Sequence, residues 1–375
     1  MAFKLNLNTT PSNKEDSADL SQFDRQIVSI EELLIYASET NCSDLYIKEY
    51  SQPYISRFGK IVRVPCRETS RDEWMKFYDK YIREELNAKY VREKMLDTST
   101  EVKIPETSKY YGKLDTNYFR YRTSLGFSEN YRIATFRMIR PEDPTFETIN
   151  YPQQCKDALY SAYGQKTGIV FFTGATGSGK TTTLAACMNT FTRPNGILDN
   201  KVIISLEDPI EYTFHSTLSV KFNQKELDKD FKSFASGVKQ ALREHPNVIL
   251  VGEARDKEVI SAAIEAARTG HIVSTSFHAG DVGGTVSRLL FHLDNSIDLA
   301  YDLILNLNII LSQRLLKRDD KYEVDTQYLL FTDYVRKTIL KAIQSGQNIQ
   351  ITVNNLVEDP ELQAAKIAKD WAYKN

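Results

Sequence analysis

The stretch that decides the fold is FFTGATGSGKTTTL, residues 171–184, in which an apolar run meets a glycine-rich turn. It fits the phosphate-loop pattern GxxxxGK[ST] at every fixed position: Gly174, Gly179, Lys180 and Thr181. Glycines let successive backbone N–H groups point inward around phosphate oxygens, and a helix that begins there aims its positive end at the anion. The pattern therefore predicts a site for a nucleotide triphosphate.

The surroundings of this loop favour the same interpretation over an ordinary glycine turn. GIVFFT (168–173) is typical of a buried strand, and TTLAACMNTF (182–191) is helical. We expect ATP and Mg²⁺ as cofactors, with the Lys180 charge at the β and γ phosphates and the Thr181 hydroxyl on the metal. The predicted nucleotide-binding residues are Gly174, Ala175, Thr176, Gly177, Ser178, Gly179, Lys180, Thr181 and Thr182.

Apolar strands alternate with helical segments after residue 154, which predicts a parallel sheet in an α/β domain over 155–375. The expected strands are 167–174, 200–208, 247–253 and 270–279, and an amphipathic helix is expected at 361–375. The remaining chain is predicted to form a flexible tail (1–26), a small α+β domain (27–140) and a linker that contains three prolines (141–154).

The α+β domain is predicted from four local patterns. SIEELLIYASET (29–40) has helical spacing and a serine suited to cap it, and 72–96 is a charged amphipathic helix pair. SDLYIKEYSQPYISRFGKIVRV (43–64) alternates around Pro53 and Gly59, and 117–139 alternates around Gly126 and Asn130, so both predict strands joined by turns.

Composition and local sequence argue against several classes of protein, although a local basic patch remains possible. The formal charge is −2, which gives no global argument for binding nucleic acid. The four cysteines are scattered without a CxxC pair, so we expect neither a disulfide framework nor a cysteine zinc site. No signal peptide is evident, and apolar runs such as LILNLNIIL (303–311) are too short to span a membrane. We expect a cytoplasmic protein whose membrane contact is peripheral.

Acidic residues follow two of the expected strands. NVILVGE ends in Glu253, which could polarise an attacking water; alternatively it caps the strand and pairs with Arg255. SLEDPIEY (205–212) places Glu207 and Asp208 where either could hold Mg²⁺ through water; a solvated acidic turn is the alternative.

Two histidines flank the last expected strand. GHIVSTSFHAGD (270–281) ends near His278, which could contact the γ-phosphate, and His271 stands at its start. A purely structural role is the alternative for both. Neither has an acidic or cysteine partner at metal-ligand spacing, so no metal site is predicted here.

In order and spacing, these elements resemble the Walker A, Asp box, Walker B and His box of the secretion ATPase superfamily, which drives type II secretion and type IV pili. The motifs are GATGSGKTTT, SLEDPIEY, LREHPNVILVGEARD and ARTGHIVSTSFHAGD. SDLYIKEYSQPYISRFGKI resembles the PAS-like domain of the PilT-like branch, and FTDYVRKTILKAIQSG resembles its C-terminal helices. No four-cysteine insert is present. GEARD and HAGDVGGTVSRLL are most similar to the DotB and TraJ ATPases of Dot/Icm type IVB secretion and IncI conjugation.

The resemblance implies a RecA-like P-loop domain preceded by a PAS-like domain, and an ATPase that works as a homohexamer. It implies Glu253 as the catalytic carboxylate, Glu207 as an aid at metal or water, and His271 and His278 as the His box. Arg122 and Arg137 match arginines that reach nucleotide phosphates, although solvated strand arginines are the alternative. Asn247 replaces the usual Asp, and SFHAGD departs from the usual ending of the His box.

The implied partner is the cytoplasmic face of an inner-membrane secretion or pilus complex, or a further secretion ATPase, without direct nucleic-acid binding. ATP hydrolysis would drive closure between the domains. The alternatives are a PilT-type pilus retraction ATPase, a DNA-translocating conjugation ATPase, and a subunit that binds nucleotide but turns over poorly.

Overall fold

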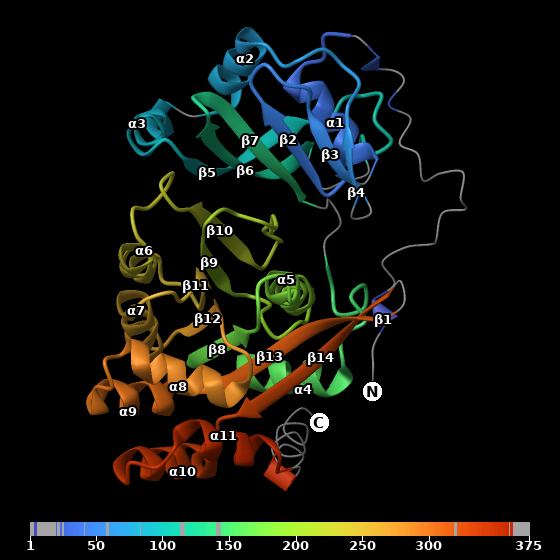
Figure 1. The fold of residues 1–375 in the computed structure, drawn as a ribbon. Helices are drawn as coiled ribbons and strands as arrows, with labels where there is room; N and C mark the ends of the chain where they lie inside the picture. Colours follow the sequence, from blue (N-terminus) through green and yellow to red (C-terminus); the bar gives the residue numbers. More distant parts are fainter. Residues whose placement is uncertain are drawn as a thin grey trace. The chain divides into compact units, whose positions relative to one another are not determined.

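The computed structural model describes residues 4–5, 20, 23–24, 26–40, 42–57, 60–82, 84–112, 117–139, 144–318, 321–359 and 361–362 (Figure 1). The chain divides into two compact units. An α/β unit contains residues 1–7, 144–207 and 213–375, and an α+β unit contains residues 8–143 and 208–212. Beyond Leu362 the predicted terminal helix lies outside the described residues, as does most of the predicted tail.

The α/β unit is built on an eight-stranded sheet with the order β1-β14-β13-β8-β12-β11-β9-β10. Neighbouring strands from β13 to β10 are parallel, and β14 and β1 add antiparallel pairs at one edge. The four strands expected from sequence are confirmed as β8, β9, β11 and β12. The strand bounds are β1 Lys4–Leu5, β8 Gly168–Thr173, β9 Val202–Glu207, β10 Lys221–Glu226, β11 Val248–Glu253, β12 Ile272–Phe277, β13 Leu307–Arg318 and β14 Lys321–Leu330.

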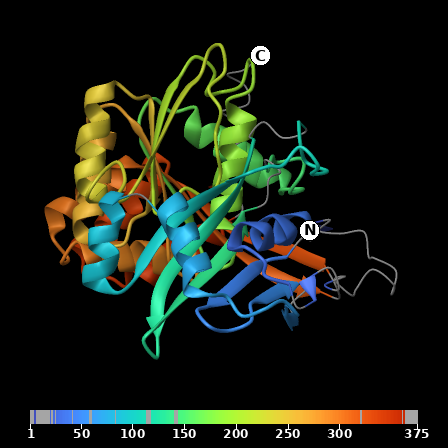
Figure 2. The same ribbon diagram turned by 90° about the horizontal axis from the view of Figure 1, so that it is seen from above.

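Helices cover both faces of this sheet, which explains why β8 is apolar throughout. Ile169 and Phe171 belong to the core that β8 shares with α6 to α11. Val170 and Phe172 point to the opposite face, where α4 and α5 pack (Figures 1 and 2). The helices are α4 Gln153–Tyr163, α5 Lys180–Phe191, α6 Phe234–Ala241, α7 Lys257–Arg268, α8 Val282–His292, α9 Ile297–Asn306, α10 Asp333–Gln344 and α11 Ile349–Val357, with a 3₁₀ turn at Leu242–Glu244.

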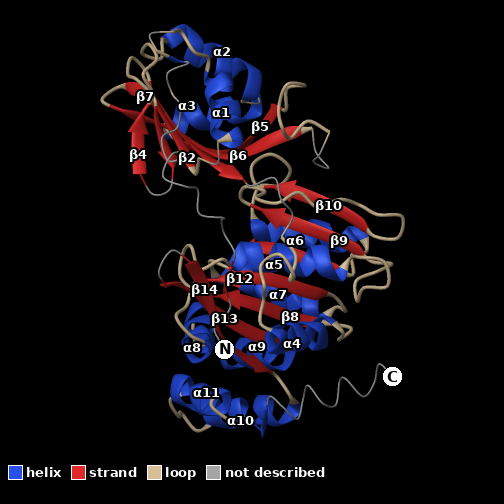
Figure 3. Ribbon diagram, turned by 90° about the vertical axis from the view of Figure 1, so that its right-hand side faces the viewer, coloured by secondary structure: helices blue, strands red, loops and turns tan. Residues whose placement is uncertain are grey.

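The α+β unit is a six-stranded antiparallel sheet with the order β4-β3-β2-β7-β6-β5, packed against three helices (Figure 3). Trp74, Phe136 and Leu33 are among the buried side chains that join the helices to the sheet. The elements are α1 Ile30–Glu39, β2 Asp44–Lys48, β3 Tyr54–Arg57, β4 Lys60–Arg63, α2 Arg71–Tyr81, α3 Glu84–Glu93, β5 Leu96–Lys103, β6 Tyr118–Ser128 and β7 Tyr131–Ile139.

Local sequence signals in this unit are largely confirmed. Ser29 caps α1 in a reciprocal capping box with Glu32, and the predicted helix pair is α2 and α3. One detail was wrong: Gly126 lies inside β6, where it pairs with Ile133, and the turn between β6 and β7 is at Glu129 and Asn130. Both turn residues have positive φ, which asparagine tolerates well.

All four cysteines are free and buried. Burial raises the pKa of the Cys155 thiol to about 11, and a hydrogen bond with Thr326 opposes that shift. Among the described residues, the structure has no helix that is both long and apolar enough to cross a membrane.

A close helix contact gives a first prediction. Helix α8 packs on α11, and a Cβ at Gly283 would lie 2.3 Å from Asn354 Oδ1 and 2.6 Å from the Gln350 backbone oxygen. Gly283→Ala should therefore lower the free energy of unfolding by about 1–3 kcal/mol, less the gain in helix propensity. The measurement is the urea midpoint. Gly280→Ala, which has open space around the new methyl group, should leave the midpoint nearly unchanged.

Candidate nucleotide site

Four neighbouring strands bring the predicted site to the end of the sheet at which these parallel strands finish, the carboxyl edge. Strands β8, β12, β11 and β9 are adjacent and parallel, so their carboxyl ends lie side by side (Figure 1). The glycine-rich loop follows β8 and His278 follows β12, while Glu253 and Glu207 are the last residues of β11 and β9. The carboxyl edge of a parallel sheet is where α/β proteins bind ligands.

The loop between β8 and α5 has the backbone that its glycines permit. Gly174, Gly177 and Gly179 have φ values of 150°, 76° and 85°, and Gly179 caps α5 in the left-handed region. A Cβ at Gly174 would lie 2.4 Å from the Gln313 backbone oxygen, so a side chain there would clash. Ala175, Thr176 and Gly177 form an exposed tip, and Thr181 is exposed in the first helical turn.

Two polar groups face the inside of this loop. Lys180 is only 8% exposed, and its Nζ donates to the carbonyl oxygens of Gly174 and Ala175, both at 2.9 Å. Ser178 is also buried, and its Oγ has no hydrogen-bond partner among the described residues. A buried hydroxyl in this condition is uncommon in folded proteins. Both groups fit a loop that holds an anion.

Glu253 sits between two partners at the end of β11. His278 Nε2 lies 3.2 Å from Glu253 Oε1, and Arg255 Nε donates to Oε2 at 2.7 Å. The contact with Arg255 is the one expected if Glu253 only ends the strand, but the contact with His278 joins two of the predicted site residues. The Glu253 side chain is 19% exposed, so its carboxylate remains accessible to water.

Glu207 is fixed rather than freely solvated. Its Oε1 accepts hydrogen bonds from Ser205 Oγ at 2.7 Å and Gln224 Nε2 at 3.0 Å. Both donors lie near the same end of the sheet, on β9 and β10. The carboxylate therefore has a defined orientation, unlike that of a mobile acidic turn.

His271 and Asn247 lie at the amino ends of β12 and β11, opposite the carboxyl edge. His271 precedes β12, and its Nδ1 is 3.0 Å from the Ala266 carbonyl oxygen. Six residues of strand, about 20 Å, separate it from His278. Asn247 joins the starts of β9 and β11, since its Oδ1 accepts from the Val202 N–H at 2.9 Å. Asn247, which replaces the usual Asp, therefore lies away from the carboxyl edge of the sheet.

Arg122 and Arg137 belong to the α+β unit, where they face each other across β6 and β7. Arg137 Nε donates to Asp44 Oδ1 at 3.0 Å, and Arg122 Nη1 lies 3.6 Å from Glu211 Oε1, within the same unit. The side chain of Arg137 is 68% exposed, and that of Arg122 is 40% exposed. Like charges directly opposite each other on a sheet are unfavourable, and each arginine has a carboxylate that reduces this cost.

Comparison with known proteins decides the family. The family model described as Type II/IV secretion system protein matches residues 21–359. The chain belongs to this family. It is 34% identical over 203 residues to the type IV pilus ATPase PilU of Pseudomonas aeruginosa, an alignment that covers 54% of this chain and only about half (51%) of PilU.

Two solved structures support the same placement over nearly the whole chain. The DotB ATPase of Legionella pneumophila matches with a TM-score of 0.73 and 25% identity, covering 92% of this chain and 98% of DotB. The pilus retraction motor PilT, solved with ADP, matches with a TM-score of 0.71 and 26% identity, covering 91% of this chain and 97% of PilT. The α/β unit has the RecA-like fold of the secretion ATPases.

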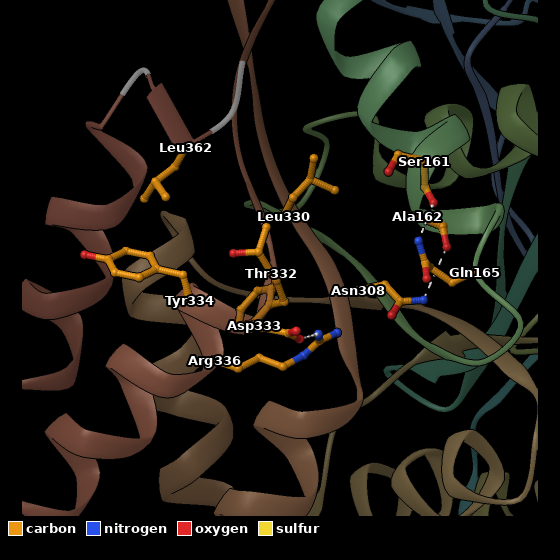
Figure 4. A pocket seen from close by; sticks show the side chains of 11 residues that line it. Ser161, Ala162, Gln165, Asn308, Leu330, Thr332, Asp333, Tyr334, Arg336 and Leu362 are labelled. Carbon is orange, nitrogen blue, oxygen red and sulfur yellow. Dashed lines mark hydrogen bonds and ion pairs between the residues drawn. The ribbon is translucent and has the colours of Figure 1, made fainter. Parts of the chain in front are cut away.

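One pocket of the α/β unit is lined by none of the predicted site residues. It has a volume of about 460 Å³ and lies between the end of α4 and the start of α10 (Figure 4). Its polar side chains contact the surrounding chain: Asn308 Nδ2 donates to two backbone carbonyls, and Arg336 donates to the Leu307 carbonyl oxygen at 2.8 Å. We interpret it as a structural cleft, since these contacts bind helices to the sheet.

Sequence reasoning missed two residues beside the loop. Gln313 on β13 donates to the Ser178 carbonyl oxygen at 2.7 Å, and Tyr151 donates to Gln313 Oε1 at 3.1 Å. The available signal was Gln313 in the stretch NIILSQRLL (308–316), because an amide that is buried in a strand needs hydrogen-bond partners.

Proposed function

We propose that the chain is an ATPase that hydrolyses ATP to ADP and phosphate, and that it drives a type IV secretion apparatus of the Dot/Icm-like or conjugative kind, or a pilus. One observation carries the proposal: the phosphate loop, the paired Glu253 and His278, and Glu207 converge on one edge of the sheet. A nucleotide-binding subunit without turnover has no need for a fixed, water-accessible carboxylate there.

Each residue has a role that follows from its position. Lys180 and the loop N–H groups bind the β and γ phosphates, and Thr181 offers its exposed hydroxyl to Mg²⁺. When bound, Mg²⁺ neutralises charge on the phosphates. Glu253 orients and polarises the attacking water, and His278 holds that carboxylate. Glu207 would help to hold Mg²⁺ through a water molecule. His271 is not part of this proposed site, because it lies at the other edge.

We further propose that Arg122 and Arg137 contact nucleotide phosphates in the assembled protein. The two guanidinium groups lie opposite each other on the sheet and repel each other, and a bound phosphate would reduce this repulsion. Arg122→Gln and Arg137→Gln should each lower the rate of ATP hydrolysis by roughly tenfold or more, as losing a charged phosphate contact does. The matched control is Arg92→Gln, because Arg92 is exposed, belongs to the same unit and pairs with Glu93. Equal rates in all three variants would contradict this role.

The assembly that we propose is a homohexamer docked on the cytoplasmic side of an inner-membrane complex, with hydrolysis coupled to closure between the units. Native mass measurement of the full chain with Mg²⁺ and a slowly hydrolysed ATP analogue should show a species of six 43.0 kDa chains. A protein that stays monomeric with and without nucleotide would contradict the ring.

The similarity to the pilus retraction motor PilT keeps pilus retraction as the second candidate. A DNA-translocating motor is disfavoured by the formal charge of −2. Adding double-stranded DNA should leave the rate of ATP hydrolysis unchanged, whereas a severalfold stimulation would favour the DNA motor.

A further inference from the structure

Strand β13 continues past the end of β8 and lies against the phosphate loop. The two strands pair in parallel, with Ser312 opposite Thr173, the last residue of β8. Gln313 therefore lies next to Gly174, where the loop begins. Its backbone oxygen comes so close that Gly174 has no space for a Cβ. This contact fixes the first residue of the loop against a rigid strand.

The side chain of Gln313 reaches the other end of the loop. It is only 1% exposed, and its Nε2 donates to the Ser178 carbonyl oxygen at 2.7 Å. Its Oε1 accepts from the Tyr151 hydroxyl at 3.1 Å. The orientation of the amide follows from these partners, because a carbonyl oxygen can only accept.

This hydrogen bond controls an N–H group of the loop. In a trans peptide the C=O and N–H groups point in opposite directions. Because the Ser178 carbonyl points toward Gln313, the N–H of Gly179 points away from Gln313, as a phosphate-binding N–H requires. The left-handed φ of Gly179, 85°, allows this peptide orientation without strain.

Tyr151 links this contact to the segment 144–151, which also holds the far end of α5. Asn189 Nδ2 donates to the Pro144 carbonyl oxygen at 2.9 Å, and the Phe146 N–H donates to Thr190 Oγ1 at 3.3 Å. The Phe146 ring stacks on Tyr151, with centroids 5.7 Å apart. One segment therefore holds the helix at its carboxyl end and, through Tyr151 and Gln313, the loop at its amino end.

We propose that Gln313 and Tyr151 are positioning residues that hold the phosphate loop in its nucleotide-binding shape. Neither residue is placed on the phosphates. Gln313 acts through the Ser178–Gly179 peptide, and Tyr151 acts through Gln313 and through the hydrogen bond of its hydroxyl with the Thr183 side chain in α5. The inference rests on the proposed nucleotide site and adds two residues to it.

The test measures the affinity of the full chain for fluorescent mant-ADP with Mg²⁺, together with the thermal midpoint. Gln313→Met keeps the size but removes both hydrogen bonds, and should raise the Kd about tenfold; Tyr151→Phe, which keeps the ring packing, should raise it about threefold. The matched control is Tyr163→Phe. Tyr163 is equally buried, its hydroxyl lies 2.5 Å from Ser274 Oγ, and its ring packs on Phe191 away from the loop.

The two tyrosine variants should lose similar thermal stability, but only Tyr151→Phe should lose affinity. The inference is overturned if Gln313→Met binds within twofold of the wild type, or if both tyrosine variants weaken binding equally. Failure of the wild-type chain to bind mant-ADP is a different result, because it overturns the proposed nucleotide site itself.

Discussion

Glu253→Gln should abolish most ATP hydrolysis and leave ATP binding nearly intact. A glutamine keeps the size of the side chain but cannot accept a proton or polarise water as a carboxylate does. Loss of such a group lowers kcat by roughly 10²–10⁴-fold. Because Glu253 ends β11 and is not part of the loop proposed to hold the phosphates, the Kd for ATP should change by no more than a few fold. Phosphate release and mant-ATP titration measure the two quantities.

The control for this variant is Glu265→Gln, which makes the same change on the exposed face of α7. It should hydrolyse ATP at the wild-type rate. If Glu253→Gln kept more than a tenth of the wild-type rate, Glu253 would have only the structural role that its contact with Arg255 suggests.

Lys180→Met should abolish nucleotide binding at concentrations that saturate the wild type. Lys180 Nζ lies inside the loop, on the carbonyl oxygens of Gly174 and Ala175, where it is well placed to meet the β and γ phosphates. Methionine keeps most of the stem and removes the charge. We expect the Kd for ATP to rise at least about 100-fold, since charge-assisted contacts to phosphate are the strong ones.

Lys239→Met, the same change on the exposed face of α6, should bind ATP like the wild type. The thermal midpoint shows whether Lys180→Met is folded. A folded Lys180→Met that binds ATP within threefold of the wild type would mean that the nucleotide binds elsewhere.

The backbone of the glycine-rich loop and its flanking elements could be predicted because their signal is local. Each required φ has a glycine, and the apolar strand and the helix on either side are contiguous in the chain. The capping of α1 by Ser29 is predictable for the same reason. By contrast, the contact between Glu253 and His278 depends on β11 and β12 being neighbours in the sheet, which residue spacing does not determine.

The features that sequence missed depend on contacts between distant residues. Gln313 lies 135 residues after Ser178, and Tyr151 lies 162 residues before Gln313. Strand β13 continues beyond the last residue of β8, which places Gln313 beside the loop. His271 lies at the start of β12 and His278 follows its end, so the length of that strand separates the two histidines, and a role for His271 at the nucleotide stays a prediction. The PAS-like character of the α+β unit stays a prediction.

The central claim is that this edge of the sheet is a Mg²⁺-dependent ATP hydrolysis site. The most direct measurement is phosphate release by the purified full chain at saturating ATP, with Mg²⁺ and with excess chelator. We predict repeated turnover with Mg²⁺ and none with chelator. Tight ATP binding without phosphate release in Mg²⁺, also after addition of the proposed membrane partner complex, would contradict the account and indicate a nucleotide-gated docking subunit.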